Sequence, residues 1–328
     1  MDEPLLEVRD LFTQFQRVDD VVYAVNGMNF SVAPGEVLGI VGESGSGKSV
    51  SVLSFLGLLR DNVKLKSGTA KFRGTDLLRL GRRQLEDIRG RDIGVVFQDP
   101  MTSLNPVRRV GDQIMEGMIT HHYASKKVAL QRTIDLLGEV GIPEPQMRYR
   151  NYPFEFSGGM RQRVMIAMAI ACEPQLLIAD EPTTALDVTV QMQILALLQT
   201  LREKRNMSII MITHDFGVAT NFCDRIIVMY AGMVMESAPL AEFLNNSVHP
   251  YTIGLKSSII EVGNKNKELV PIPGMAPVLT KPLNHCPYVS RCSVAQDRCE
   301  QELPELLHVG NEHYVACHRI EEVGIHAK

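Results

Sequence analysis

The sequence lacks three features that would each place the chain in a broad class of protein. No apolar run approaches the ~18 residues that span a bilayer, and the most apolar helical candidate, residues 164–172, is bounded by Arg163 and Glu173. The net charge of −4 gives no general excess of basic residues, which a surface that coats nucleic acid would need. The N-terminus, Met-Asp-Glu-Pro, lacks the basic start and apolar stretch of a secretory signal. We therefore expect a cytoplasmic chain that does not cross a membrane by itself and has no nucleic-acid partner.

What the sequence does contain is an alternation of short apolar runs with helix-like stretches, which predicts a parallel sheet wrapped by helices. At 328 residues the chain is long enough for two domains. The strand candidates are continuously apolar and rich in β-branched residues, as strands buried on both faces are: residues 36–41, 93–98, 175–179, 208–213 and 225–230. We expect an α/β domain over residues 1–255 and a C-terminal extension over 256–328.

Two further segments subdivide the chain. Residues 99–173 contain helix-period stretches, which indicates a helical subdomain inserted in the α/β core. A polar stretch at residues 261–268 is followed by a Pro-Ile-Pro-Gly sequence at 271–274, which cannot continue a helix. We interpret them as the connector to the C-terminal extension.

A glycine-rich string follows the first strand candidate and precedes a helix candidate at residues 50–59. It fits the pattern G-x-x-x-x-G-K-[ST], in which backbone N–H groups and a helix N-terminus face phosphate oxygens. Lys48 adds a positive charge, and the Ser49 hydroxyl can bind Mg²⁺. The alternative is a glycine-rich loop that contains a lysine by chance. It does not explain why a strand candidate precedes the string and a helix candidate follows it. The string therefore predicts a phosphate loop made by Gly42, Glu43, Ser44, Gly45, Ser46, Gly47, Lys48 and Ser49.

Two carboxylates, Asp180 and Glu181, follow the apolar run at residues 176–179. Ligands of open α/β sheets bind outside the carboxyl ends of the strands, so both side chains should reach that crevice. One carboxylate can hold Mg²⁺ while the next polarises an attacking water, and we assign Asp180 to the metal and Glu181 to the general base. Taken alone, such a pair is more often a solvated turn or a helix cap, but the phosphate loop upstream favours the catalytic interpretation.

Two more polar residues end or follow strand candidates. His214 follows residues 208–213 and is well placed to contact the terminal phosphate or to order the base, although a lone histidine is usually structural. Gln98 ends the run at residues 93–98. The alternative to a catalytic role is that Gln98 is an ordinary polar loop residue. We assign both residues to the catalytic group, and Gln98 also to Mg²⁺.

Residues 156–163, Phe-Ser-Gly-Gly-Met-Arg-Gln-Arg, form a second candidate anion site. Ser157 is a suitable N-cap for the apolar helix that follows, and Gly158 and Gly159 expose N–H groups. If this string stood alone, a capped helix start would be the favoured interpretation.

These strings, in this order and together with Ala-Leu-Asp at residues 185–187, resemble the ABC ATPase superfamily. The resemblance implies an ABC-type P-loop NTPase, with a RecA-like core, an antiparallel β subdomain and a helical subdomain, here followed by a small cysteine-rich C-terminal extension. It also implies a head-to-tail dimer that encloses ATP between the phosphate loop of one cassette and the signature of the other. In this chain the signature side comprises Ser157, Gly158, Gly159, Met160 and Asp187.

At one position the sequence departs from the family pattern, and for the residue that stacks on adenine it offers two candidates. Met160 stands where the family usually has glutamine, which removes a hydrogen-bonding side chain, so we expect altered contacts with retained activity. By family spacing, Phe15 is the aromatic residue that stacks on adenine. Tyr23 competes for that role, and the Phe15 ring can equally be ordinary core.

More narrowly, residues 156–190 and His-Pro-Tyr-Thr at 249–252 are similar to the ATPase subunits of oligopeptide and dipeptide importers. That similarity implies a chain that hydrolyses ATP to power peptide import at the cytoplasmic face of the bacterial inner membrane. The implied partners are a second, different ATPase subunit, two transmembrane permease subunits and a peptide-binding protein. Nickel and glutathione are alternative cargoes, because the ATPase does not form the cargo pocket. A nucleic-acid ABC ATPase is the rival, but there is no long heptad insertion, second cassette or strongly basic stretch.

Four of the six cysteines lie in the last segment: Cys286, Cys292, Cys299 and Cys317. Four soft ligands among few large apolar residues predict a metal site, although the spacing lacks the tight C-x-x-C pairs that would identify the metal. Free thiols or disulfides are the alternative, although a reducing cytosol disfavours stable disulfides. Some peptide importer subunits carry a [4Fe-4S] cluster in such a segment, so the resemblance implies that cluster here. Zinc, with His285 or His318 as a substitute ligand, is the alternative.

Overall fold

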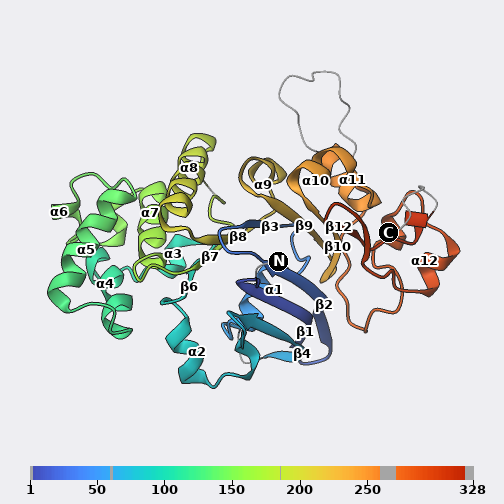
Figure 1. Ribbon diagram of the computed structural model, residues 1–328, viewed down its shortest axis with the longest axis horizontal. Helices are drawn as coiled ribbons and strands as arrows, with labels where there is room; N and C mark the ends of the chain where they lie inside the picture. The colour runs from blue at the N-terminus through green and yellow to red at the C-terminus, as the bar shows by residue number, and fades with distance from the viewer. Residues whose placement is uncertain (1–2, 60–61, 185, 259–270, 322–328) are drawn as a thin grey trace. The chain divides into compact units, whose positions relative to one another are not determined.

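The computed structural model describes residues 3–59, 62–184, 186–258 and 271–321. The chain divides into two compact units (Figure 1). Unit 1 comprises Met1–Ala33, Val37–Arg79 and Ile212–Lys328, and unit 2 comprises Pro34–Glu36 and Leu80–Met211. The predicted polar connector at 261–268 lies outside the described residues, and residues 271–274 form neither helix nor strand. The predicted domain boundary at residue 255 stays a prediction.

Unit 1 contains an antiparallel sheet in the order β2–β1–β4–β5. Its strands are β1 (Leu6–Gln16), β2 (Val21–Val32), β4 (Val63–Phe72) and β5 (Thr75–Asp76). Buried and exposed positions mix along β1 and β2, as expected for strands with one face on the core. This sheet matches the antiparallel β subdomain that the family resemblance implied.

The other strands of unit 1 are ordered β11–β12–β10–β9–β3. They are β3 (Val37–Val41), β9 (Arg225–Tyr230), β10 (Met233–Pro239), β11 (Leu307–Gly310) and β12 (His313–Val315). Strands β3 and β9 are parallel, and the remaining neighbours are antiparallel. Every residue of β3 is buried, because a continuously apolar strand is stable only when both of its faces are covered.

The helices of unit 1 follow or precede these strands. They are α1 (Lys48–Phe55), α9 (Phe216–Phe222), α10 (Leu240–Asn246), α11 (Pro250–Ser257) and α12 (Asp297–Gln301), with short 3₁₀ turns η1 (Leu77–Arg79), η3 (Val289–Arg291) and η4 (His318–Glu321).

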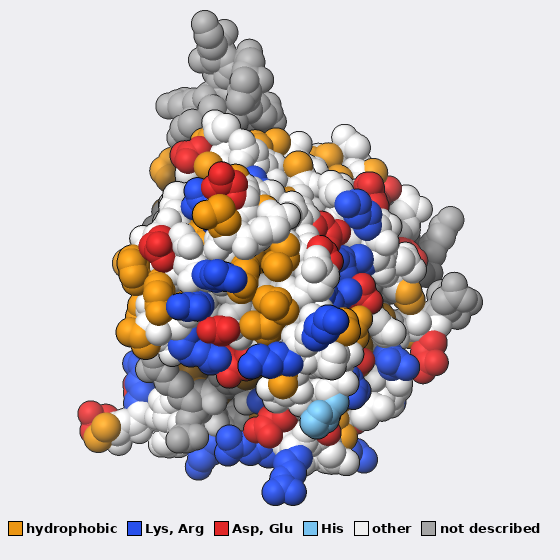
Figure 2. Space-filling view, turned by 90° about the vertical axis from the view of Figure 1, so that its left-hand side faces the viewer, with side chains coloured by type: hydrophobic (Ala, Val, Ile, Leu, Met, Phe, Trp, Pro, Cys, Tyr) orange, Lys and Arg blue, Asp and Glu red, His pale blue; other side chains and the backbone are white. Residues whose placement is uncertain are grey.

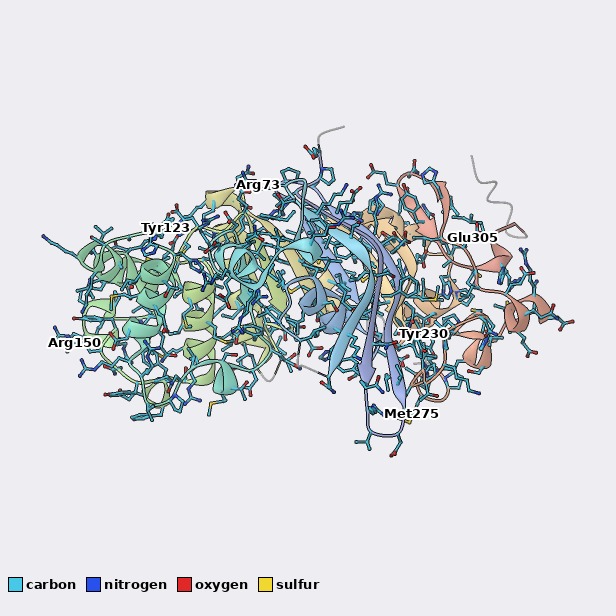
Figure 3. All side chains as sticks on the ribbon, turned by 90° about the horizontal axis from the view of Figure 1, so that it is seen from below. Arg73, Tyr123, Arg150, Tyr230, Met275 and Glu305 are labelled. Carbon is cyan, nitrogen blue, oxygen red and sulfur yellow. The ribbon has the colours of Figure 1, made fainter. Side chains whose placement is uncertain are left out.

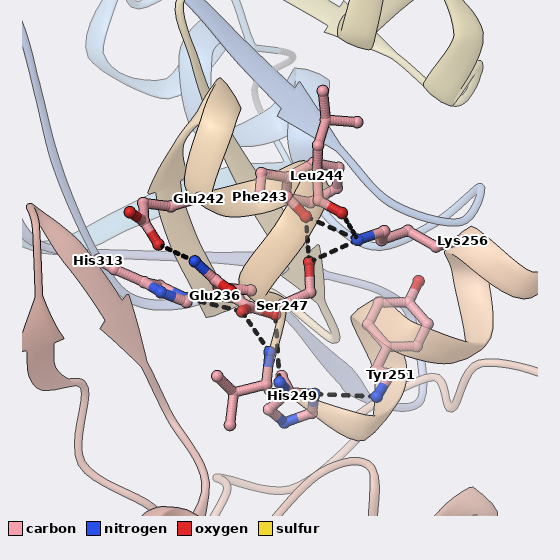
Figure 4. A network of polar contacts seen from close by, with 11 residues as sticks. Glu236, Glu242, Phe243, Leu244, Ser247, His249, Tyr251, Lys256 and His313 are labelled. Atoms are coloured by element: carbon pink, nitrogen blue, oxygen red, sulfur yellow. Dashed lines mark hydrogen bonds and ion pairs between the residues drawn. The ribbon is translucent and has the colours of Figure 1, made fainter. Parts of the chain in front are cut away.

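The C-terminal segment, residues 271–321, is part of unit 1. Strand β12 pairs with β10, where Glu236 faces Val315. The fully buried Glu236 carboxylate lies 2.7 Å from Nε2 of His313 and accepts hydrogen bonds from the backbone N–H groups of Val248 and His249 (Figure 4). Strand pairing and this buried polar network therefore join the segment to the rest of the unit, in place of the metal-held extension expected from the cysteines.

Unit 2 contains the parallel strands β6 (Ile93–Val96) and β7 (Leu176–Asp180), with β8 (Ser208–Thr213) beginning in this unit beside β7. Its helical elements are α2 (Arg82–Ile88), α3 (Pro100–Ser103), α4 (Val110–Thr120), α5 (Lys126–Glu139), α6 (Pro145–Arg148), η2 (Pro153–Glu155), α7 (Gly158–Ala169) and α8 (Val188–Arg205). Elements α3 to α7 all fall within residues 99–173, where the sequence predicts helices. Figure 2 shows the side that carries these helices, where apolar side chains lie among Lys and Arg side chains.

The predicted strands at residues 208–213 and 225–230 match β8 and β9 to the residue. The helix predicted at 50–59 begins two residues earlier, at Lys48, because the phosphate loop itself leads into the first helical turn. Within the described ranges, no helix combines the length and the apolar character that crossing a bilayer requires.

Candidate functional site

The phosphate loop of unit 1 joins β3 to α1 and depends on glycines with backbone angles that other residues avoid. Gly42 has φ 151°, and a Cβ added there would lie 2.2 Å from the carbonyl oxygen of Met229. Gly47 has φ 95°, and its added Cβ would lie 2.4 Å from the carbonyl oxygen of Ala24. A Cβ added at Gly45 would meet nothing within 4 Å. The loop is thus packed against protein at two glycines and open at the third, as a backbone cradle for phosphate requires.

Lys48 holds the loop in this shape. Its side chain is buried, and its Nζ donates hydrogen bonds to the carbonyl oxygens of Gly42 at 2.8 Å and Glu43 at 2.9 Å. The positive charge therefore lies inside the loop, beside the N-terminus of α1. Both features favour an anion. Ser49 is the second residue of α1 and is half-buried. Its role as a ligand of Mg²⁺ stays a prediction.

A cavity of about 340 Å³ adjoins the loop, and Gly45 and Gly47 are among its lining residues. Phe15 and Tyr23, the two candidates for stacking on adenine, line the same cavity. Phosphate-binding glycines and an aromatic wall in one cavity fit a nucleotide. The choice of Phe15 over Tyr23 stays a prediction, since the cavity admits either ring.

The acidic pair of unit 2 lies at the carboxyl end of β7. Asp180 is the buried last residue of the strand, and Glu181 follows in the left-handed region with φ 48°, a conformation that costs energy for a residue other than glycine. The Glu181 carboxylate accepts a hydrogen bond from Nε2 of Gln98 at 2.8 Å and one from the hydroxyl of Thr184 at 2.9 Å. Because β6 and β7 are parallel neighbours, Gln98 and Glu181 meet at one edge. The sequence did not identify Thr184.

The signature string forms the N-terminus of α7 in unit 2. Ser157 is the N-cap, and its Oγ accepts a hydrogen bond from the N–H of Met160 at 3.3 Å. This bears out its assignment as an N-cap. Ser157 and Gly158 are exposed, and the nearest atom to a Cβ added at Gly158 is 4.0 Å away, on Leu186. The helix start is therefore open to a ligand from outside the chain.

Asp187 and His214 lie at two other element ends. Asp187 is the N-cap of α8, where it accepts a hydrogen bond from the N–H of Val190 at 2.9 Å. Ala185, the first residue of its sequence string, lies outside the described residues. His214 follows β8 in unit 1 and is exposed, directly before Asp215, the N-cap of α9. The structure assigns Asp187 a local structural role, and the nucleotide roles of both residues stay predictions.

The predicted [4Fe-4S] cluster on Cys286, Cys292, Cys299 and Cys317, and zinc as its alternative, are wrong. In the part of the chain that the structure describes, which contains all four residues, no three or more His, Cys, Asp or Glu side chains are arranged to hold a metal ion. The cysteines are free of disulfides and line a cavity of only about 10 Å³, roughly the room that one water molecule needs.

The acid–base chemistry of these thiols agrees with that correction. Burial raises the pKa of Cys286 to about 11, and burial also raises the pKa values of Cys292 and Cys317. Burial therefore disfavours the thiolate form, which a metal ligand requires, at these three positions. His285 contacts Oδ1 of its neighbour Asn284, and His318 contacts a backbone carbonyl. The number of cysteines in this segment could be read from the sequence, whereas the arrangement of their sulfur atoms could not.

Several residues that line the nucleotide cavity or contact the phosphate loop were not predicted from the sequence. Pro277, Val278 and Leu279 line the cavity, and Tyr251 and Arg291 contact Glu43 of the loop. All of them lie more than 200 residues after the loop in the sequence. Tyr251 belongs to the His-Pro-Tyr-Thr string at 249–252, but nothing in that string indicates a contact with the loop. Only the apolar character of residues 277–279 was a weak signal.

Comparisons with known proteins agree with this geometry. The family model described as ABC transporter matches residues 25–184, and one described as oligopeptide/dipeptide transporter, C-terminal region, matches residues 235–299. The chain is 47% identical over 321 residues to the probable peptide ABC transporter ATP-binding protein y4tR of Sinorhizobium fredii, covering 97% of this chain and 96% of that protein. It is 49% identical over 300 residues to the oligopeptide transport ATP-binding protein OppD of Salmonella typhimurium, covering 92% and 89%.

A solved structure gives the same result at the level of the fold. The ATP-binding cassette MJ0796, determined as a dimer in a post-hydrolysis state bound to ADP and Pi, superposes with a TM-score of 0.65 at 29% sequence identity. The match covers 72% of this chain and 98% of that one.

Proposed function

The chain belongs to the ABC transporter family of ATP-binding proteins, and from this membership we propose that it is the ATPase subunit that powers a peptide importer. The family resemblance predicted from the sequence is thereby confirmed. One observation carries the peptide assignment: a single chain matches both the cassette and the oligopeptide/dipeptide C-terminal region, and it aligns over nearly the full length of proteins named for peptide transport. The cargo is a di- or oligopeptide.

The phosphate loop and the acidic pair divide the work of ATP hydrolysis. The loop N–H groups and the buried Lys48 ammonium bind the phosphates and offset their negative charge. The family resemblance assigns Mg²⁺ to Ser49 of unit 1 and to Asp180 and Gln98 of unit 2. Each offers an oxygen atom of the kind that Mg²⁺ prefers, and the ion, when bound, would supply further charge neutralisation.

Glu181 orients and deprotonates the attacking water. The Gln98 amide and Thr184 hydroxyl fix the orientation of its carboxylate, which supports this role. His214 contacts the terminal phosphate or orders the base.

The signature side completes the site of a second ATPase subunit. Ser157, Gly158, Gly159 and Met160 present an exposed helix N-terminus, which favours the γ-phosphate of a nucleotide held by the partner, and Asp187 lies beside that interface. ATP then favours the closed dimer because only the closed state completes its binding site. Hydrolysis removes that preference and resets the transporter.

The remaining partners follow from the same proposal. We expect a heterodimer with a different ABC ATPase, two transmembrane permease subunits and a peptide-binding protein that acts with the complex. The chain would lie at the cytoplasmic face of the inner membrane as a peripheral subunit. Its cassette would occupy residues 1–255, with the helical subdomain at about 99–173.

The experiment is co-purification of the tagged full-length chain from gently solubilised native membranes, followed by ATPase assays of the recovered complex. Two permeases and a second cassette, with ATP hydrolysis stimulated by peptide and its binding protein, are the expected result. Permeases with stimulation by nickel or glutathione would overturn the peptide cargo. Recovery of nucleic acid or ribosomal proteins without permeases would overturn transport altogether.

A further inference from the structure

Glu43, the second residue of the phosphate loop, has all three of its polar groups engaged. Its carbonyl oxygen accepts from the Lys48 ammonium at 2.9 Å, and its N–H donates to the hydroxyl of Tyr251 at 3.1 Å. Its carboxylate accepts from Nη1 of Arg291 at 2.9 Å. The first contact is internal to the loop, whereas the other two come from more than 200 residues further along the chain. The position of the loop is therefore fixed by residues outside it.

Arg291 belongs to the C-terminal segment, where it forms the end of η3. Its side chain is only 6% exposed, and its other donors reach the carbonyl oxygens of Pro273, at 2.7 Å, and Gly274, at 3.3 Å. A planar guanidinium presents its donors in a rigid fork, so a single side chain joins residues 273–274 to the phosphate loop. Removing the Glu43 carboxylate would leave the charge of the buried Arg291 side chain without this partner.

An aromatic cluster supports the same contact. Tyr230, Tyr251 and Tyr288 lie with ring centroids 4.7 to 5.3 Å apart. Tyr230 and Tyr251 are fully buried, and the Tyr230 hydroxyl lies 3.3 Å from Nη1 of Arg291. Figure 3 shows Tyr230 within the unit and the exposed Met275 at its edge. The cluster packs Tyr288 of the C-terminal segment against the tyrosine that holds the Glu43 backbone.

The C-terminal segment also reaches the nucleotide cavity. Pro277, Val278 and Leu279 line it beside Phe15 and Tyr23. The N–H of Tyr23 donates to the carbonyl oxygen of Leu279 at 2.9 Å, so this stretch is fixed to the β2 residue that forms the aromatic wall. Apolar side chains at that place suit the faces of a purine base.

We propose that the C-terminal segment forms part of the nucleotide site. Arg291 is a positioning residue that holds the phosphate loop in place through Glu43. Residues 277–279 form one wall of the base pocket. The ligand is a purine nucleoside di- or triphosphate. The inference rests on the proposed ATPase function, and it extends the site to a region of the chain that carries none of the catalytic motifs. It predicts that substitutions in this segment can weaken phosphate binding and base binding independently of each other.

The test uses full-length chain, with dissociation constants for ATP, ADP and adenosine measured by equilibrium dialysis. Arg291→Met should weaken ATP and ADP binding by about tenfold, because a displaced loop loses aligned donors, and should leave adenosine binding unchanged. Arg291→Lys should recover part of the loss. The matched control is Arg298→Met, which removes an exposed arginine of the same segment that pairs with Glu302, and it should change none of the three constants.

A lower unfolding temperature with unchanged ATP and ADP binding would overturn the positioning role of Arg291. If Arg291→Met does not fold, Glu43→Gln and Arg291→Lys supply the comparison: each should weaken ADP binding, and the double variant should be no weaker than the weaker-binding single variant. Additive losses would contradict a shared contact. Wild-type chain that binds no nucleotide would instead refute the proposed function.

The base wall is tested by Leu279→Ala in the same assay. We expect adenosine, ADP and ATP to bind more weakly by one common factor of about three, since the lost contact is to the base alone. Unchanged adenosine binding would remove residues 277–279 from the site.

Discussion

The phosphate loop in unit 1 and the start of α7 in unit 2 are both glycine-rich helix starts suited to anions, yet they are held in different ways. The loop is fixed from several sides, by the buried Lys48, by Tyr251 and by Arg291. The start of α7 is exposed and held by one local cap, Ser157. A site that must bind ligand within its own chain benefits from preorganisation, whereas a surface that another subunit completes must stay open. Under the proposed function, the difference separates the half of the nucleotide site that this chain forms alone from the half that it offers to a second subunit.

The largest expected effect separates hydrolysis from binding. Glu181→Gln keeps the shape of the side chain and an acceptor for the Thr184 hydroxyl, but an amide cannot take a proton from water. Turnover by the assembled transporter should fall by roughly a thousandfold, while the ATP affinity of the isolated chain changes little. The variant should also form an ATP-dependent complex with the second ATPase that survives size-exclusion chromatography.

The matched control for this variant is Glu203→Gln, which changes an exposed carboxylate of α8 that accepts only from Gln199 among the hydrogen bonds seen. It should turn over normally. Ordinary turnover in Glu181→Gln would refute the assigned base.

The second-largest expected effect tests whether the start of α7 binds the γ-phosphate of a nucleotide held by a partner subunit. Gly158→Asp places a negative charge where a γ-phosphate is proposed to bind, and space exists for the side chain. Hydrolysis by the assembled pair should fall by about tenfold to a hundredfold, with the ATP affinity of the isolated chain unchanged. Gly117→Asp in α4, where an added Cβ meets nothing within 4 Å, is the control. Weaker ATP binding by the isolated Gly158→Asp chain would break the comparison between the two regions.

Local features of these regions could be predicted from the sequence, whereas contacts between residues far apart in the chain could not. The strands β8 and β9 and the N-cap Ser157 were predicted correctly because continuous apolar runs and capping are local properties. The contact between Arg291 and Glu43 joins residues 248 apart, and nothing in either neighbourhood indicates it. The prediction of a metal cluster was wrong for a related reason: cysteine spacing shows how many thiols a segment holds, but not how the side chains are arranged or that the cavity they line has a volume of only about 10 Å³.

The smallest expected effect concerns the cap itself. Ser157→Ala removes the acceptor for the Met160 N–H, a single bond of 3.3 Å, and should lower the free energy of unfolding by about 0.5 to 1 kcal/mol in a urea titration. Asp215→Ala, which removes an N-cap that accepts from two N–H groups of α9 in unit 1, should cost more. If Ser157→Ala leaves the unfolding free energy unchanged, the start of α7 does not depend on its cap. The rest of α7 would then hold the helix start, and the Ser157 cap would no longer distinguish this region from the phosphate loop.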